Sequence, residues 1–322
     1  MLDDKLKALW TRISPPQKAA FFGCFLSGYL VHLYVFTNII PNSDGLSRIF
    51  DPQQMTVSGR WFLHFASYFN GFTQMPAVIG LFSVLFLALA AALAVSLLGI
   101  RSRALSALSG ALMAAFPAVG YTFLYLFTAS AYCFAIFLAV LSVSLARRGR
   151  WHWLAGCLLL ACSMGTYQAY VTVAIGLSLL VIFWETLDPS ASFSATLRLG
   201  VRLMLFLAAG AVLYYGILLV FLQVKDLELL SYLGMDAASS GYPFSRLPGL
   251  LLDTYKQVAA FFFLPGSANT FTSGWMAVLD LAALALGGGC FLLCMGQEGL
   301  WRARWRPLGG LAMLALLPLG IN

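Results

Sequence analysis

The sequence has few charged residues. Charged residues make up 10% of its 322 positions, whereas an ordinary soluble domain has about 25%. Apolar residues reach 61%, against about 45–50% in soluble domains. This balance excludes a soluble globular domain and a disordered chain. It also argues against a nucleic-acid partner, although the net charge is +7, because basic loops of membrane proteins give the same excess.

Common signals of metal, redox and nucleotide chemistry are also missing. The six cysteines all fall in apolar runs and no pair has CxxC spacing, which predicts buried free thiols. The sequence has no Walker loop, dinucleotide-binding fingerprint, HExxH or GxSxG motif. These absences argue against a nucleotide-driven pump.

Long apolar runs are present instead. They predict an all-α fold, a polytopic transmembrane helical bundle of about eight to nine spans, because one span needs about 20 apolar residues. We predict a single integral-membrane domain, 1–322, and leave open a truncation at the C-terminus. The predicted spans are residues 19–40, 75–99, two within 104–146, two within 152–187, 199–223, 274–296 and one that starts near 308.

The basic residues predict an orientation. With a cytoplasmic N-terminus, 14 of the 19 basic residues fall in inner segments, as the positive-inside rule requires. The two long loops, about 41–74 and 225–274, then lie outside. Each contains an aromatic stretch too short to span, 61–69 and 250–264, which fits either a helix in the membrane interface or an ordinary amphipathic connector. We expect the active site on this outer face.

The first outer loop contains two acids and two arginines. Asp44 follows the first span closely, where a carboxylate beside the membrane suits a general base. Arg48 and Arg60 suit an anionic phosphate, which guanidinium groups bind by paired hydrogen bonds. The alternative is a solvated loop in which Asp44 or Asp51 pairs locally with arginine.

Two outer turns carry further polar groups. Gln168 and the two tyrosines of the segment 165–170, Tyr167 and Tyr170, offer donors and acceptors to a sugar ring, or else hydrogen-bond between helices. Thr128, Ser130 and Tyr132, in the segment 127–132, either line the same cavity or cap the next span. Pro117 is expected to shorten or kink its span. His32 lies in mid-span, where an ionisable residue marks either a site or a satisfied packing position.

These motifs, taken in order, resemble the bacterial GtrII-type glucosyltransferase family. The resemblance rests on Ser43-Asp44, Ser58-Gly59-Arg60-Trp61, Phe116-Pro117, Phe127-Thr128-Ala129-Ser130-Ala131-Tyr132 and Gly165-Thr166-Tyr167-Gln168-Ala169-Tyr170. It implies a GT-C-like membrane glycosyltransferase in the bacterial plasma (inner) membrane. Such an enzyme moves a sugar, here glucose, from a polyprenyl-phosphate carrier to a cell-surface glycan such as O-antigen, on the outer face.

The resemblance also implies roles for single residues. Asp44 is the expected catalytic base, and Arg60 with Arg48 holds the lipid phosphate. The expected substrate-binding residues are Arg48, Arg60, Trp61, Thr128, Tyr167 and Gln168. No cofactor is expected. A divalent metal stays open, although Asp44 and Asp51 alone are a poor hard-cation site.

The expected partners are the polyprenyl-phosphate-linked sugar donor, a glycan or lipid-linked glycan acceptor, and membrane lipids. Two other functions remain as alternatives. A lipid-linked sugar transporter or flippase needs a polar path at mid-depth in the membrane. A non-catalytic assembly subunit needs neither Asp44 nor Arg60.

Overall fold

The computed structural model describes residues 7, 10–40, 43–47, 51–230, 244–266, 273–297 and 299–321. Every regular element in these ranges is helical, and Met55 and Arg60 form an isolated antiparallel bridge outside any strand. The predicted all-α fold is therefore confirmed.

The chain forms two compact units. Unit 1 comprises residues 1–174 and 202–232, and unit 2 comprises 175–201 and 233–322. Helices α10 (Val171–Leu187) and α11 (Phe193–Val224) contribute residues to both units. The single membrane domain stays a prediction.

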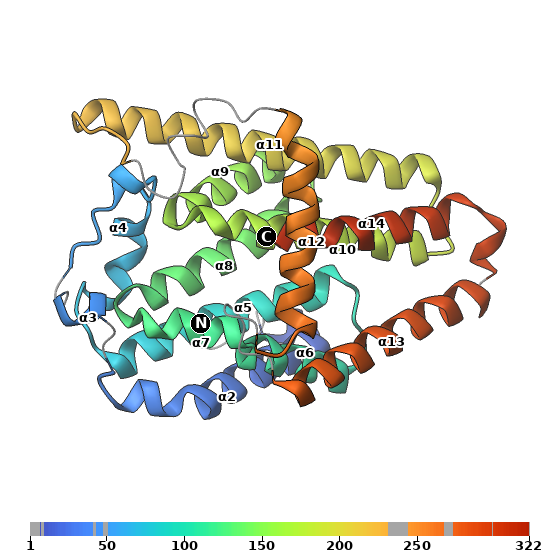
Figure 1. Cartoon of the computed structure of the whole chain (residues 1–322), viewed down its shortest axis with the longest axis horizontal. Helices are drawn as coiled ribbons and strands as arrows, with labels where there is room; N and C mark the ends of the chain where they lie inside the picture. The colour runs from blue at the N-terminus through green and yellow to red at the C-terminus, as the bar shows by residue number, and fades with distance from the viewer. Residues whose placement is uncertain are drawn as a thin grey trace. The chain divides into compact units, whose positions relative to one another are not determined.

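Unit 1 consists of helices that pack side by side in an order different from their order in the chain. Helix α6 packs on α2, α2 on α5, α5 on α8, and α8 on α9, and their ribbons run alongside one another (Figure 1). Their bounds are α2 Pro15–Thr37, α5 Pro76–Leu97, α6 Arg103–Ala115, α7 Pro117–Leu124, α8 Leu126–Ala146 and α9 Arg150–Thr166.

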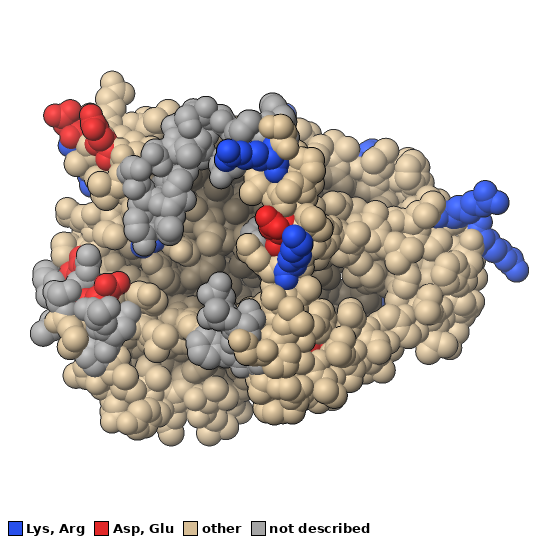
Figure 2. Space-filling model, viewed as in Figure 1, with Lys and Arg blue, Asp and Glu red and all other residues tan. Residues whose placement is uncertain are grey.

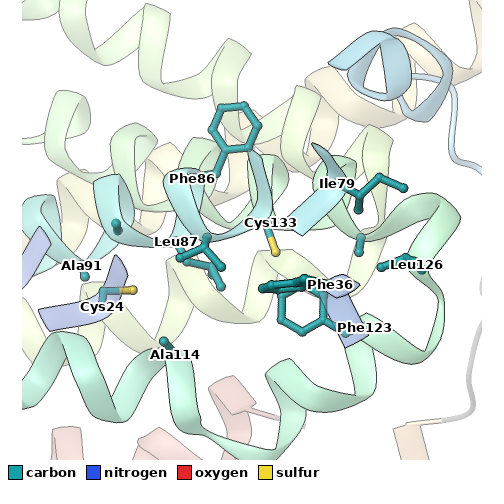
Figure 3. Close-up of a cluster of buried hydrophobic side chains, with 13 residues drawn as sticks. Cys24, Phe36, Ile79, Phe86, Leu87, Ala91, Ala114, Phe123, Leu126 and Cys133 are labelled. Atoms are coloured by element: carbon teal, nitrogen blue, oxygen red, sulfur yellow. The ribbon is translucent and has the colours of Figure 1, made fainter. Parts of the chain in front are cut away.

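A cluster of buried apolar side chains holds α2, α5, α7 and α8 together. Phe36 of α2 meets Phe123 of α7 edge to face, with ring centroids 4.9 Å apart, and Cys133 of α8 lies beside them (Figure 3). Cys24, Cys133 and Cys157 are free and buried, as predicted, whereas Cys290 and Cys294 are exposed, so the prediction of buried thiols is wrong for those two. Within a membrane such close packing supplies much of the attraction between helices.

The span after residue 103 is broken at Pro117, as predicted. Helix α6 ends at Ala115, Pro117 begins α7, and the two axes differ by 41°. The break leaves carbonyls in the last turn of α6 without their usual amide donors. His32 fills this need, because its Nε2 donates to the Ala114 carbonyl at 2.9 Å. His32 is thus a satisfied packing residue, the second of the two alternatives.

Unit 2 contains a helix that packs on two others. Helix α12 (Leu247–Phe263) packs on α13 (Gly274–Gln297) and α14 (Trp305–Ile321), and it runs across α14 (Figure 1). Its Tyr255 hydroxyl donates to the Ala315 carbonyl. The face in Figure 2 has few charges. On α12, Lys256 and Asp253 form an exposed contact of 3.2 Å. The stretch 250–264 is thus helical, whereas its place in the membrane interface stays a prediction.

The aromatic stretch at 61–69 does not form one continuous helix, which is one of its two predicted alternatives. It forms one α-helical turn, α4 (Leu63–Ala66), and one 3-10 turn, η2 (Ser67–Asn70), which ends at Gly71. Leu63 and Ala66 are buried and pack with Ala131 of α8. This segment is therefore shorter than a continuous helix and is partly buried inside unit 1.

Six described helices are long and apolar enough to cross a membrane, or seven if the bent α6–α7 pair counts as one span. The chain is thus a membrane protein by its helices. Helices α9 and α14 have 17 residues each, the lower limit for a span of about 17–25 residues. The predicted count of eight to nine spans is not confirmed.

Arginines near the predicted inner ends cap other helices. Arg147 Nη1 donates to the Leu97 carbonyl at the end of α5, at 3.2 Å. Arg202 Nε donates to the Ala146 carbonyl at the end of α8, at 2.7 Å. Cations at helix C-termini satisfy free carbonyls and oppose the helix dipole. The same residues that predict orientation therefore also stabilise helix ends.

Arg306 makes the most extensive of these contacts. It is 7% exposed, and its guanidinium donates to four carbonyls at 2.6–3.1 Å. The acceptors follow one another at the end of α10 and in the next loop: Thr186, Asp188, Pro189 and Ala191. Hydrogen bonds from the Ser190 hydroxyl and amide, with a smaller effect of Arg306, lower the pKa of Asp188.

Candidate functional site

The candidate site is built around a tight turn before Arg60. Residues Thr56–Ser58 form a 3-10 turn, and Gly59 follows with φ 78°, a left-handed conformation that glycine adopts without strain. The amides of Ser58 and Arg60 both donate to the Met55 carbonyl at 3.1 Å. The turn therefore fixes the backbone position of Arg60.

The turn is attached to the break between α9 and α10. The Phe62 amide donates to the Gly165 carbonyl at 2.7 Å, and Gln168 Nε2 donates to the Ser58 carbonyl at 2.7 Å. Gly165 leaves room for the Trp61 ring, because a Cβ at position 165 would lie 2.6 Å from ring atom Cε2. Two motifs more than 100 positions apart thus meet directly.

The Arg60 side chain contacts tyrosines of two later motifs, residues 127–132 and 165–170. Its guanidinium lies over the Tyr167 ring, 4.6 Å from the centroid, and its Nη1 donates to the Tyr132 hydroxyl at 3.3 Å. The side chain is half-buried, and its buried Nε has no hydrogen-bond partner in the described part of the chain. Nor does any carboxylate of those residues form an ion pair with it.

Three tyrosines pack against one another beside this guanidinium. Tyr132 stacks on Tyr167 at 5.3 Å, and Tyr170 meets both rings nearly edge to face at 5.9 and 5.6 Å. We call Arg60, Tyr132, Tyr167 and Tyr170 the arginine–tyrosine cluster. The sequence analysis named all four residues, Arg60 for a phosphate, Tyr167 and Tyr170 for a sugar ring and Tyr132 for the lining of the cavity, but it did not predict that they contact one another.

Trp61 and Thr128 lie next to this cluster. Trp61 is 6% exposed, its Nε1 has no partner among the described residues, and its ring stacks on Phe221 of α11 at 5.7 Å. The Thr128 hydroxyl donates to the Tyr125 carbonyl at 3.1 Å. Phe221 was not predicted, because it looks like any other aromatic residue in an apolar span.

The structure describes both acids of the first loop. Asp44 is exposed, on the one-turn helix α3 (Ser43–Ser47). Gln74 Nε2 holds this turn through the Gly45 carbonyl at 2.6 Å. Asp51 is half-buried and its Oδ1 accepts from the Gln53 amide at 2.8 Å. Arg48 lies outside the described residues, so its predicted role stays untested.

The site brings together one cation, several aromatic faces and unpaired donors. No group of three or more histidine, cysteine or acidic side chains within the described ranges is arranged to hold a metal ion. A half-buried guanidinium without an acid attracts an anion, and aromatic rings suit the faces of a sugar. The site can therefore attract an anion beside aromatic rings.

Together the fold and the cluster define a helical membrane protein with a cationic, tyrosine-lined site. The model of the family Glucosyl transferase GtrII matches residues 33–320, nearly the whole chain. The protein therefore belongs to the GtrII glucosyltransferase family. No curated protein and no solved structure matches the chain.

Proposed function

We propose that this protein transfers glucose from a polyprenyl-phosphate carrier to a cell-surface glycan, on the face of the membrane opposite its N-terminus. Family membership supports glucosyl transfer. We propose in addition the polyprenyl-phosphate donor, the glycan acceptor, the GT-C-like class and the location in the bacterial inner membrane.

One observation carries the proposal. Arg60 is a half-buried cation with a ring on one face, one neutral hydrogen bond and no acid partner in the described chain. Burying an unpaired charge is costly, so such an arrangement is best explained by an anionic ligand. A phosphate ester between a sugar and an apolar carrier fits both the guanidinium and the surrounding membrane helices.

The proposed chemistry is a displacement at the anomeric carbon. Asp44 accepts the proton of an acceptor hydroxyl, whose oxygen forms a bond to that carbon. The bond between the carbon and the phosphate oxygen breaks, and its electron pair leaves with the polyprenyl phosphate. Arg60 stabilises the charge on this leaving group. Trp61, Thr128, Tyr167 and Gln168 surround the sugar or hold the residues that do.

The test is a transfer assay on the purified protein in lipid nanodiscs, with polyprenyl-phosphate glucose and candidate glycan acceptors. We expect glucose transfer by the wild type and a rate about 10²–10⁴-fold lower for Asp44→Asn, the range that general bases contribute. Asp253→Asn removes an acid from exposed α12 and should transfer at the wild-type rate. An Asp44→Asn enzyme as fast as the wild type would refute the assignment of the base.

The transporter alternative finds less support. It needs polar groups at mid-depth, and His32 is already hydrogen-bonded to the end of α6. Asp280 is half-buried but lies in the first two turns of α13, close to a helix end. The same nanodisc assay separates the functions, because a transporter moves the lipid-linked sugar without forming a glycosidic bond.

A further inference from the structure

Two side chains hold the peptide groups just before Arg60. Gln168 Nε2 donates to the Ser58 carbonyl at 2.7 Å, and the Tyr214 hydroxyl donates to the Gly59 carbonyl at 3.1 Å. The last two backbone carbonyls before Arg60 therefore each accept a hydrogen bond from a side chain, and these two hydrogen bonds form a small polar network around the turn.

Tyr214 supplies the part of this network that comes from α11. Its side chain is 7% exposed, whereas the next residue, Tyr215, is 47% exposed. A buried hydroxyl needs a hydrogen-bond partner, and for Tyr214 that partner is the backbone of a turn 155 positions earlier in the chain. The side chain thus links α11 to the turn and not only to neighbouring apolar groups.

Arg60 depends on this link more than an ordinary arginine would. Its guanidinium is held by one hydrogen bond of 3.3 Å and by a ring contact, both of which leave it room to shift. The position of its charge is therefore set largely by its backbone, which the turn and the network fix. A displacement of about 1 Å in a binding group can cost a large part of its effect.

We infer that Tyr214 is a positioning residue, which places Arg60 for binding the phosphate of the donor. The inference rests on the proposed function, because it takes that phosphate as the ligand of Arg60. Tyr214 itself need not touch the substrate. Its hydroxyl acts through the Gly59 carbonyl, and Gln168 completes the same network from the other side.

Kinetics of Tyr214→Phe and its neighbour Tyr215→Phe test the role. Loss of one buried hydrogen bond should raise KM for polyprenyl-phosphate glucose about three- to tenfold, with kcat changed less than about twofold because ground-state binding is lost. Tyr215→Phe should leave both constants unchanged. In an Arg60→Ala background Tyr214→Phe should add nothing, since the group that it positions is gone.

Hydrogen–deuterium exchange gives a second readout that does not depend on activity. The amides of Arg60 and Phe62 donate to Met55 and Gly165, so a peptide over 55–62 should exchange faster in Tyr214→Phe than in Tyr215→Phe. If Tyr214→Phe does not fold, Gln168→Met removes the other half of the network and should show the same change.

The outcomes separate the two proposals. Faster exchange with a raised KM supports the positioning role. Exchange or KM equal to that of Tyr215→Phe overturns it. If Arg60→Ala leaves the donor KM at the wild-type value, the proposed function fails instead. Faster exchange in Tyr214→Phe would then show that Tyr214 holds the backbone of the turn, but it would overturn the role of Tyr214 in donor binding.

Discussion

Two arginines of this protein, the buried Arg306 and the half-buried Arg60, use their charges in different ways. Arg306 in unit 2 donates to four backbone carbonyls. Arg60 in unit 1 donates to one phenol, lies over a ring and has a buried Nε without a partner in the described chain. The first charge is fully used by the fold, and the second is available to a ligand.

The comparison gives a rule for choosing functional residues in a membrane protein. Basic residues at the predicted inner ends are numerous, and Arg147, Arg202 and Arg306 each satisfy helix C-terminal carbonyls. Such contacts explain the residue without any ligand. Arg60 makes no such contact with a helix end among the described residues. It lies instead beside Tyr132 of α8 and beside Tyr167 and Tyr170 from the break between α9 and α10.

The largest expected effect is on stability, at Arg306. Arg306→Met should lower the free energy of unfolding by about 3–5 kcal/mol, since removing a buried charged partner leaves its acceptors unpaired. Thermal and denaturant unfolding in detergent would measure it. The matched control is Arg304→Met on the same turn, where the side chain is exposed. Equal stability of the two variants would contradict the claim that the charge of Arg306 stabilises the fold.

One glycine near each arginine allows a second comparison of the two regions, Gly165 near Arg60 and Gly309 near Arg306. An added Cβ at Gly165 lies 2.6 Å from the Trp61 ring, whereas one at Gly309, near the Arg306 contacts, lies 3.4 Å from Thr186. Gly165→Ala should cost about 1–3 kcal/mol through overpacking and should reduce glucose transfer, because the ring and the turn must shift. Gly309→Ala should be neutral or stabilising, since alanine favours helix.

Unfolding and transfer assays on the two alanine variants give both readouts. A Gly165→Ala protein with wild-type stability and activity would mean that the turn tolerates displacement. That result would contradict the geometric account of the arginine–tyrosine cluster.

The smallest effect is a pH dependence at the Arg306 loop. The pKa of Asp188 is lowered in the fold by Ser190 and, to a lesser extent, by Arg306. Its stabilising contribution is therefore present above the unfolded carboxyl pKa of about 3.9 and lost as the pH falls through the lowered value. Asp188→Asn should be slightly less stable than the wild type at pH 7, and the difference should shrink below about pH 4 in unfolding curves. A difference that grows on acidification would contradict this.

Much of the fold could be predicted from apolar runs and helix breakers. Pro117 and the Gly165–Thr166 segment break long runs close to where the helices end. The sequence also grouped Arg60 with Tyr167, because both follow outer ends of predicted spans. Such features are local in the chain, and their periodicity or side-chain chemistry is visible without a structure.

Features that depend on contacts between distant helices could not be predicted. Tyr214 lies in an apolar run beside Tyr215, and nothing in the sequence shows which of the two reaches the Gly59 carbonyl. Arg306 likewise cannot be told from Arg302 or Arg304 by sequence. The choice is made by tertiary packing.

The most direct test of the central claim is binding of polyprenyl-phosphate glucose without acceptor, measured on the wild type, Arg60→Ala and the exposed-charge control Arg101→Ala. A hydrogen-bonded charge pair is worth about 2–5 kcal/mol, so we predict an affinity at least about 30-fold lower for Arg60→Ala, an unchanged affinity for Arg101→Ala and equal thermal stability of all three. Donor binding by Arg60→Ala at the wild-type affinity would contradict the claim that this unpaired guanidinium holds the donor phosphate.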